Sequence, residues 1–245
     1  MKTNQKSGGA SKPGPRASDD GETGSASLTG RTDGLSGNVY QQIRNAIVSG
    51  ELVPGQRVTE TKLAESLNVS RTPIREAVQR LETEGVLRHS PRQGLIVRQL
   101  EYQEVVELYA MRLVLESTAA GLSAQQATDP EIEILSDIVD MEGTVETGDA
   151  EQSINYNKVF HETLAQSAHN RYLIDSIRSL DNSMILLGGS TLVSEGRRKQ
   201  AVQEHRAVVE AIKQRDTEAA RDAMAHHIKG AQRKRLQIIM RSRTE

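Results

Sequence analysis

The sequence lacks cysteine and tryptophan altogether, and it contains only one phenylalanine and five tyrosines in 245 residues. Without cysteine no disulfide framework can form, which fits a reducing compartment. No apolar run approaches the roughly 18 residues of a membrane span, and the N-terminus lacks the hydrophobic segment of a signal peptide. The scarcity of aromatic rings argues against base-stacking recognition of single-stranded nucleic acid. We therefore expect a cytoplasmic protein without a membrane segment.

The formal net charge of −2 conceals an uneven distribution along the chain. Residues 37–98 hold nine Lys and Arg against six Asp and Glu, a net charge of +3, whereas residues 99–245 hold 17 against 23, a net charge of −6. This polarity directs DNA toward the first segment and away from the second. Since the length suits two domains, we predict a tail over 1–36, a DNA-binding domain over 37–98 and a second domain over 99–245.

The expected tail, residues 1–36, consists mainly of Gly, Ser, Thr, Pro, Lys and Asp. Such a composition cannot bury enough apolar surface to order itself, so we predict disorder. The simpler interpretation is a solubilising tail. The alternative is weak attraction of phosphates by its basic residues, Lys2, Lys6, Lys12 and Arg16.

A helix is predicted between Ser70 and Gly85. Ser70 or Thr72 can act as its N-cap, Pro73 is tolerated in a first turn, and Gly85 stands where a helix end favours a left-handed residue. Its apolar residues recur with helical spacing at Ile74, Ala77, Val78 and Leu81. A second face, which carries Arg71, Arg75 and Gln79 at intervals of four, therefore projects away from the core.

The residues before this helix predict a helix-turn-helix. Leu63, Ala64 and Leu67 indicate a short helix entered through Thr59, and residues 68–70 are long enough only for a sharp corner. In this motif the second helix lies in the major groove, with its N-terminal residues toward the base edges. We therefore predict that DNA is contacted by Arg71, Thr72, Arg75 and Gln79.

A basic hairpin is predicted after the second helix. Residues 86–88 and 95–98 indicate strands joined by a turn over residues 90–94, and Arg88, Arg92 and Arg98 suit phosphates or the minor groove. The unit is then a winged helix-turn-helix, preceded by a first helix with the apolar stripe Val39, Ile43, Ala46 and Ile47. The alternative, that the arginines only solvate an exposed face, does not explain why cap, corner, wing and basic face coincide.

From about residue 101 onward the pattern is helical throughout, with no alternating strand pattern after the wing. We predict a mainly α protein whose second domain is an all-α bundle of six or seven helices. The first long helix of this bundle places Arg112 in a stripe of otherwise apolar residues, where an anion must meet it. That anion is either a ligand carboxylate or a protein acid such as Glu116, one turn away.

Four residues of the bundle can converge on one point. Asn157 and His161 are four apart on one helix, and His205 and His227 each lie eleven residues from the helix break at Asp216. If the last two helices fold back on each other, three imidazoles and an amide meet, a donor set that suits Zn²⁺ or another borderline divalent ion. The alternative is unrelated core or surface histidines. The other three histidines, His89, His169 and His226, are expected to face solvent.

An enzymatic interpretation is weaker. Three histidines with an open position can activate water, as in a metallohydrolase. However, the sequence has no HExxH, and Glu162 and Glu204 each adjoin a histidine in sequence and are expected to point to other faces. A third interpretation is an architectural DNA protein that uses the helical domain only to dimerise.

The sequence resembles the GntR family of bacterial transcription regulators, in the FadR-like subfamily with an FCD ligand-binding domain. In the first domain the resemblance rests on IVSGELVPG from Ile47, on LAESLNVSRTPIREAVQRLETEGVL from Leu63 and on the wing glycine Gly94. In the second it rests on MRLVLESTAA from Met111, NKVFHETLAQSAHN from Asn157 and EHRAVVEAIKQRDTEAARDAMAHHI from Glu204.

The resemblance implies a homodimer that binds a pseudo-palindromic DNA operator, usually as a repressor. A small carboxylate or sugar-acid effector would bind in the helical pocket over a divalent metal held at Asn157, His161, His205 and His227. The family pattern has an aspartate where Asn157 stands, and an amide is a weaker ligand. Arg71 and Arg75 correspond to arginines that contact DNA, whereas Thr61 stands where some relatives carry another such arginine.

Overall fold

The computed structural model describes residues 26–146 and 149–242. The first domain contains helices α1 (Ala26–Ser49), α2 (Glu60–Ser66) and α3 (Arg71–Thr83), followed by strands β1 (Leu87–Ser90) and β2 (Gly94–Val97). The strands pair antiparallel, with Leu87 opposite Val97 and Ser90 opposite Gly94. The winged helix-turn-helix predicted for this part of the chain is therefore confirmed.

Helix α1 begins earlier than the composition indicates. It overlaps the expected tail from Ala26 to Ser36, so the boundary predicted at residue 37 falls inside a helix. The helix is continuous with the apolar stripe that begins at Val39, and glycine and serine in its first half do not interrupt it. The rest of the expected tail, residues 1–25, lies outside the described residues.

The core of the first domain is formed where α1 and α3 pack together over the hairpin. The predicted apolar stripe of α3 is fully buried, and Ile43 and Ile47 of α1 are 1% and 0% exposed. Thr59 caps α2 by accepting a hydrogen bond from the Lys62 amide, and Gly85 after α3 has φ +70°. The apolar stripe therefore fixes which face of α3 is buried, and the signals at Thr59 and Gly85 mark where α2 begins and where α3 ends.

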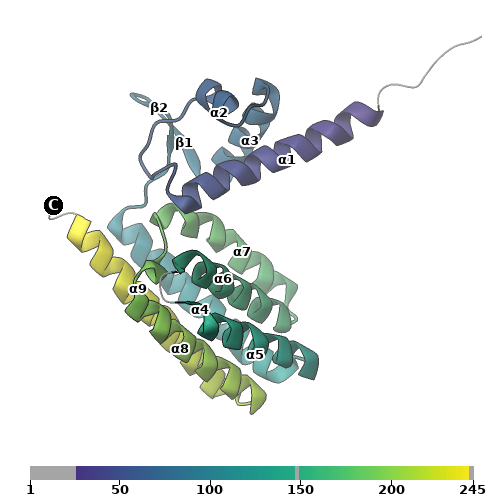
Figure 1. The fold of residues 1–245 in the computed structure, drawn as a ribbon, viewed down its shortest axis with the longest axis vertical. Helices are drawn as coiled ribbons and strands as arrows, with labels where there is room; N and C mark the ends of the chain where they lie inside the picture. The colour runs from purple at the N-terminus through teal and green to yellow at the C-terminus, as the bar shows by residue number, and fades with distance from the viewer. Residues whose placement is uncertain (1–25, 147–148, 243–245) are drawn as a thin grey trace, which may run out of the picture.

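The second domain is a bundle of six α-helices in the described residues, as predicted. They are α4 (Tyr102–Gln126), α5 (Asp129–Thr144), α6 (Ala150–Ser167), α7 (Arg171–Met184), α8 (Glu195–Lys213) and α9 (Thr217–Ser242), with 3₁₀ turns at Ile185–Leu187 (η1) and Thr191–Val193 (η2). Figure 1 shows this bundle below the first domain, with α4, α8 and α9 side by side. None of the described helices is long and apolar enough to cross a membrane.

The two domains are in direct contact through the segment that follows α7. Leu186 of η1 is 3% exposed and belongs to the hydrophobic core of the first domain. Arg44 of α1 donates a hydrogen bond to the Asn182 side chain at the end of α7. On the bundle side, Arg235 of α9 donates to the carbonyls of Leu187 (2.9 Å) and Gly189 (2.5 Å). A shift of this segment within the bundle must therefore disturb the packing of the first domain.

Candidate nucleic-acid interface and candidate metal centre

Helix α3 presents its predicted polar face to solvent. Ser70 is the N-cap in an extended conformation, which places Thr72 inside the first turn. The side chains of Arg71 and Arg75 are 66% and 65% exposed. A shallow surface hollow is lined by Arg71, Thr72, Arg75, Glu76 and Gln79. The four side chains expected to contact DNA are therefore accessible and adjacent to one another.

One carboxylate lies between the two leading arginines. Glu60, in the first turn of α2, has its Oε2 atom 3.9 Å from Arg71 Nη2 and 3.7 Å from Arg75 Nε. Exposed ion pairs of this kind contribute little to stability, at most about 1 kcal/mol. Both guanidinium groups can therefore exchange Glu60 for a phosphate or a base edge at small cost.

The wing agrees with the prediction except at its last arginine. Arg88 and Arg92 are exposed, and Gly94 has φ +75°, a conformation that favours glycine. Arg98 instead turns toward the second domain and forms an ion pair with Glu104 of α4. Arg98 lies between β2 and α4, where Glu104 is close enough to pair with it, and its contact with DNA phosphates stays a prediction.

Three histidines from separate helices meet inside the bundle, as the sequence predicts. His161 (α6), His205 (α8) and His227 (α9) offer ligand atoms that all lie within 4.8 Å of one another. The Nε2 atoms of His161 and His227 are 3.2 Å apart, and the buried Nε2 atom of His205 has no hydrogen-bond partner. The equal distances of His205 and His227 from the corner at Asp216 produce this meeting, because α8 and α9 pack against each other.

Each imidazole has a carboxylate at its other nitrogen. The Nδ1 atoms of His205 and His227 are hydrogen-bonded to Glu142 (2.7 Å) and Glu204 (2.8 Å). His161 Nδ1 lies 2.5 Å from Glu116 Oε2, although the two groups are not aligned as a hydrogen bond. A carboxylate at Nδ1 favours the proton there, which is the usual arrangement around a metal-bound histidine. His205 Nε2 then carries a free lone pair, whereas the Nε2 atoms of His161 and His227 share a hydrogen bond, so one of these two atoms carries the proton in the metal-free protein.

The interior keeps the rings of two histidines neutral. Burial lowers the pKa of His205, although its hydrogen bond to Glu142 partly opposes the effect. Burial lowers the pKa of His227 further, and the neighbouring His205 adds to this. Metal ions bind the neutral form of imidazole, so these side chains are held in the state that a ligand requires.

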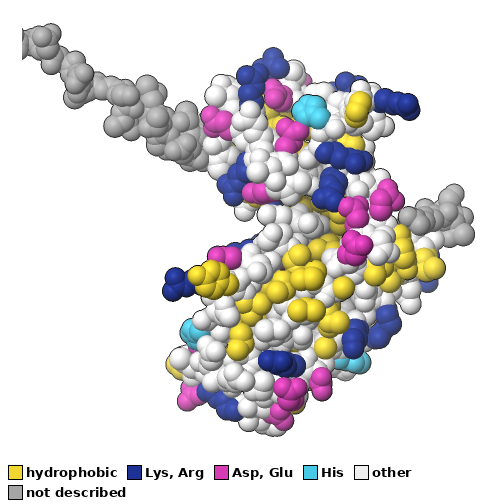
Figure 2. Space-filling view, turned by 180° about the vertical axis from the view of Figure 1, so that it is seen from behind, with side chains coloured by type: hydrophobic (Ala, Val, Ile, Leu, Met, Phe, Trp, Pro, Cys, Tyr) yellow, Lys and Arg dark blue, Asp and Glu magenta, His cyan; other side chains and the backbone are white. Residues whose placement is uncertain are grey.

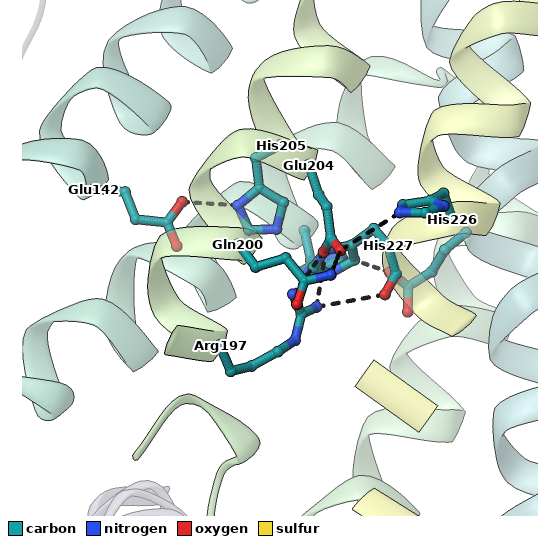
Figure 3. Close-up of polar contacts among 9 residues, drawn as sticks. Glu142, Arg197, Gln200, Glu204, His205, His226 and His227 are labelled. Carbon is teal, nitrogen blue, oxygen red and sulfur yellow. Dashed lines mark hydrogen bonds and ion pairs between the residues drawn. The ribbon is translucent and has the colours of Figure 1, made fainter. Parts of the chain in front are cut away.

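Glu142 and Arg197 were not identified from the sequence as residues of this centre, and Glu204 was expected on another face. Figure 3 shows Glu142 beside His205, and Arg197 and Glu204 beside His227. Glu204 was expected to point to another face because it adjoins His205, but it reaches α9 and contacts His227. Arg197 Nη1 lies 2.7 Å from Glu204 Oε2, and Gly230 leaves room for this pair because an added Cβ would lie 3.0 Å from Glu204 Oε1.

Arg112 has a partner within the protein. It forms an ion pair with Glu116, and its side chain is 13% exposed. Burial opposes ionisation of Glu116, but Arg112 and His161 outweigh it and lower the pKa of Glu116 to about 2. Of the two alternatives for Arg112, pairing with a protein acid is therefore the one present in this structure.

The other positions singled out from the sequence are Asn157, the three remaining histidines and Thr61. Asn157 lies on α6 one turn before His161 and is half-buried, which leaves its role as a fourth donor a prediction. The side chains of His89, His169 and His226 are 70%, 45% and 65% exposed, as expected of solvent-facing residues. Thr61 is exposed on α2 and lines a surface hollow together with Arg71.

An arginine-faced helix beside a wing, joined to a helical bundle, is typical of the class of DNA-binding transcription regulators. Residues 35–97 match the bacterial regulatory proteins of the gntR family, and residues 107–230 match the FCD domain. The chain therefore belongs to the FCD-domain (FadR-like) branch of the GntR family of transcription regulators, which are not enzymes.

Relatives and solved structures agree with this assignment. The chain is 32% identical over 190 residues to the HTH-type transcriptional regulator YdhC of Bacillus subtilis, covering 77% of this chain and 85% of the relative. It is 30% identical to the gluconate operon transcriptional repressor of Bacillus licheniformis, covering 71% and 74%, and 30% identical to the probable D-xylose utilization operon repressor of Paenarthrobacter nicotinovorans, covering 78% and 85%. Escherichia coli McbR/YncC shares the fold, with a TM-score of 0.72, 24% identity and coverage of 84% and 98%.

The lowered pKa values predict how metal-free protein responds to acid. The unfolded chain takes up a proton at each histidine below about pH 6.5, whereas folded His227 resists it. In chelator, the free energy of unfolding of the wild type should therefore fall as the pH drops below about 6.5. In His227→Gln this fall should be shallower, because one proton fewer is taken up on unfolding. The two slopes should differ by up to about 1.4 kcal/mol per pH unit. Denaturant titrations from pH 7.5 to 5.5 measure it. Exposed His169→Gln is the control, and equal slopes in all three proteins would count against buried neutral rings.

Proposed function

We propose that the protein is a homodimeric repressor that binds a pseudo-palindromic operator and responds to a small organic acid in its helical domain. The observation that carries this proposal is the exposed arginine face of α3, which is packed against the core on its opposite side. A rigid helix with exposed guanidinium groups at its N-terminal end suits the major groove. The relatives named as operon repressors support repression. Because such a repressor acts on the chromosome, we place it in the cytoplasm.

The contacts divide by chemistry. Arg71 and Arg75 suit the paired acceptors of guanine, and Gln79 suits adenine. The hydroxyl of Thr72 and the guanidinium of Arg92 suit phosphates, which set the position of the protein on the duplex. Gly94 allows the wing backbone to approach DNA closely, since it lacks a side chain.

A dimer would place two α3 helices in successive major grooves, about 34 Å apart. Figure 2 shows hydrophobic side chains gathered across one face of the bundle. On α4, Met111 and Val114 leave 49% and 55% of their surface exposed. Apolar surface of this kind supports association of two helical domains. A dimer with twofold symmetry would recognise an operator with the same symmetry, which is a pseudo-palindrome.

The histidine centre fits a divalent transition metal such as Zn²⁺. His205 and His227 are buried, burial lowers the pKa of both, and His205 Nε2 has no partner within the described residues. His161, His205 and His227 would hold the ion through Nε2, with Asn157 as a weaker neutral oxygen donor. Such an ion supplies an anchor for a carboxylate oxygen of the effector.

The effector we propose is a small carboxylate or sugar acid. The gluconate and D-xylose operon repressors among the relatives support this class. Arg112 is the residue expected to receive the effector carboxylate, and it would share its guanidinium between the ligand and Glu116. Ligand binding must favour one inter-domain geometry to change DNA affinity, and the contact through Leu186 supplies the physical link.

One prediction concerns α3, the helix proposed to enter the major groove. Arg75→Ala should abolish retardation of an operator fragment while the dimer survives, because an exposed contact is lost without disturbing the core. Arg206→Ala removes an arginine of similar exposure (55%) from the bundle and should bind as the wild type does. Electrophoretic mobility shifts with size-exclusion chromatography measure both. Unchanged operator binding by Arg75→Ala would count heavily against the proposal.

The affinity for operator DNA, compared with the affinity for random DNA at one salt concentration, distinguishes a regulator from an architectural protein. The proposal expects at least about a thousandfold preference for the operator, whereas an architectural protein binds both almost equally.

A further prediction concerns the effector. With gluconate as the first probe of a hydroxy-acid panel, zinc-loaded wild type should gain thermal stability, since a ligand of the folded state raises Tm. Arg112→Lys keeps the positive charge but loses the planar fork, so its gain should be much smaller. An equal gain in both proteins would remove Arg112 from the ligand site, and no gain from any acid would remove the ligand class.

A further inference from the structure

The three carboxylates of the histidine centre differ in their cationic partners. Glu116 is paired with Arg112, and Glu204 is paired with Arg197. Glu142 has no such partner: within residues 26–146 and 149–242, no lysine or arginine lies within ion-pair distance of it. The centre therefore contains one acid whose charge the protein leaves unbalanced.

Glu142 is thoroughly buried. Its side chain is 2% exposed, and it accepts a 2.7 Å hydrogen bond from His205 Nδ1. Arg206 packs nearby, over Gly143, but pairs with Asp140 at 3.5 Å and remains 55% exposed. A buried carboxylate without a cation is expensive to maintain, since it has left water without equivalent compensation.

The geometry also shows where a compensating charge would lie. The Glu142 hydrogen bond fixes His205 with its proton on Nδ1, so its lone pair is on Nε2, the atom that lacks a partner. The side chains that contact the three rings include three carboxylates, and only two guanidinium groups pair with these acids, so one negative charge is left over. A divalent cation among the Nε2 atoms offsets the surplus negative charge.

We propose that Glu142 is a positioning residue that also supplies the histidine centre with one unbalanced negative charge, which favours a divalent cation. It orients His205 and, because it has no arginine of its own, it strengthens metal binding while destabilising the metal-free protein. The inference rests on the metal centre proposed above. It distinguishes Glu142 from Glu204, whose charge Arg197 already balances.

The two acids therefore respond oppositely to the same substitution. Glu142→Gln keeps a hydrogen-bond acceptor for His205 and removes an unbalanced charge, so metal-free protein should become more stable. Glu204→Gln keeps a partner for His227 but leaves Arg197 buried without an anion, so metal-free protein should become less stable. Glu142→Gln should nevertheless bind Zn²⁺ about 10 to 100 times more weakly than wild type.

The experiment measures Tm in chelator and Zn²⁺ affinity by competition with a chromogenic chelator, for full-length wild type and each variant. The control is Glu162→Gln, which removes a 57% exposed acid beside His161 and should change neither quantity. We expect Tm in chelator to rise by a few degrees for Glu142→Gln and to fall for Glu204→Gln.

The outcomes separate the inference from the function on which it rests. Wild type that binds no Zn²⁺ would overturn the metal centre itself, and the inference with it. Wild type that binds Zn²⁺, together with undiminished affinity in Glu142→Gln, would overturn only the role of Glu142. A Glu142→Gln protein that is less stable in chelator, or fails to fold, would also overturn it, because a purely structural hydrogen bond would then explain the residue.

Discussion

The helical domain depends on one constraint: three imidazoles must each turn one ring nitrogen toward the same buried point. Neutral rings alone would not hold this arrangement, since each can rotate or exchange its tautomer. The carboxylates of Glu116, Glu142 and Glu204 stand at the opposite nitrogens, and the hydrogen bonds to Glu142 and Glu204 settle the orientation of two rings. Carboxylates in a bundle core need partners in turn, which explains why Arg112 and Arg197 are buried there. The polar interior is thus one connected network rather than separate pairs.

This network lies close to the part of the bundle that touches the DNA-binding domain. Helix α7 packs on α4 and α6, which carry Arg112 and His161, and it ends at the segment that inserts Leu186 into the first domain. Arg235 holds the carbonyls of that segment from α9, the helix that also carries His227. Changes among the metal-centre helices therefore have a short mechanical path to α1 and, through the shared core, to α3.

Much of this organisation could be predicted, because it follows from local chemistry. The stripe of α3, the N-cap position of Ser70 and the left-handed Gly85 depend only on neighbours in sequence, and the structure confirms them, although the Ser70 side chain makes no capping hydrogen bond. The meeting of His205 and His227 followed from equal distances to one corner.

Glu142 could not be found in this way, since its helix, α5, carries no other residue of the centre and only tertiary packing brings it to His205. Glu204 was missed because adjacency to His205 was taken to exclude it, although a long side chain can reach the next helix. The ion pair between Arg98 and Glu104 could not be foreseen either, because it depends on how the two domains pack.

The central claim is that the buried histidine cluster binds a metal ion, and metal content tests it most directly. Elemental analysis of protein purified without chelator, or incubated with Zn²⁺ and desalted, should find one divalent transition-metal ion per chain. The same preparation of His161→Ala/His205→Ala should contain almost none. Wild type that retains no metal under either condition, while folded and able to bind DNA, would contradict the claim.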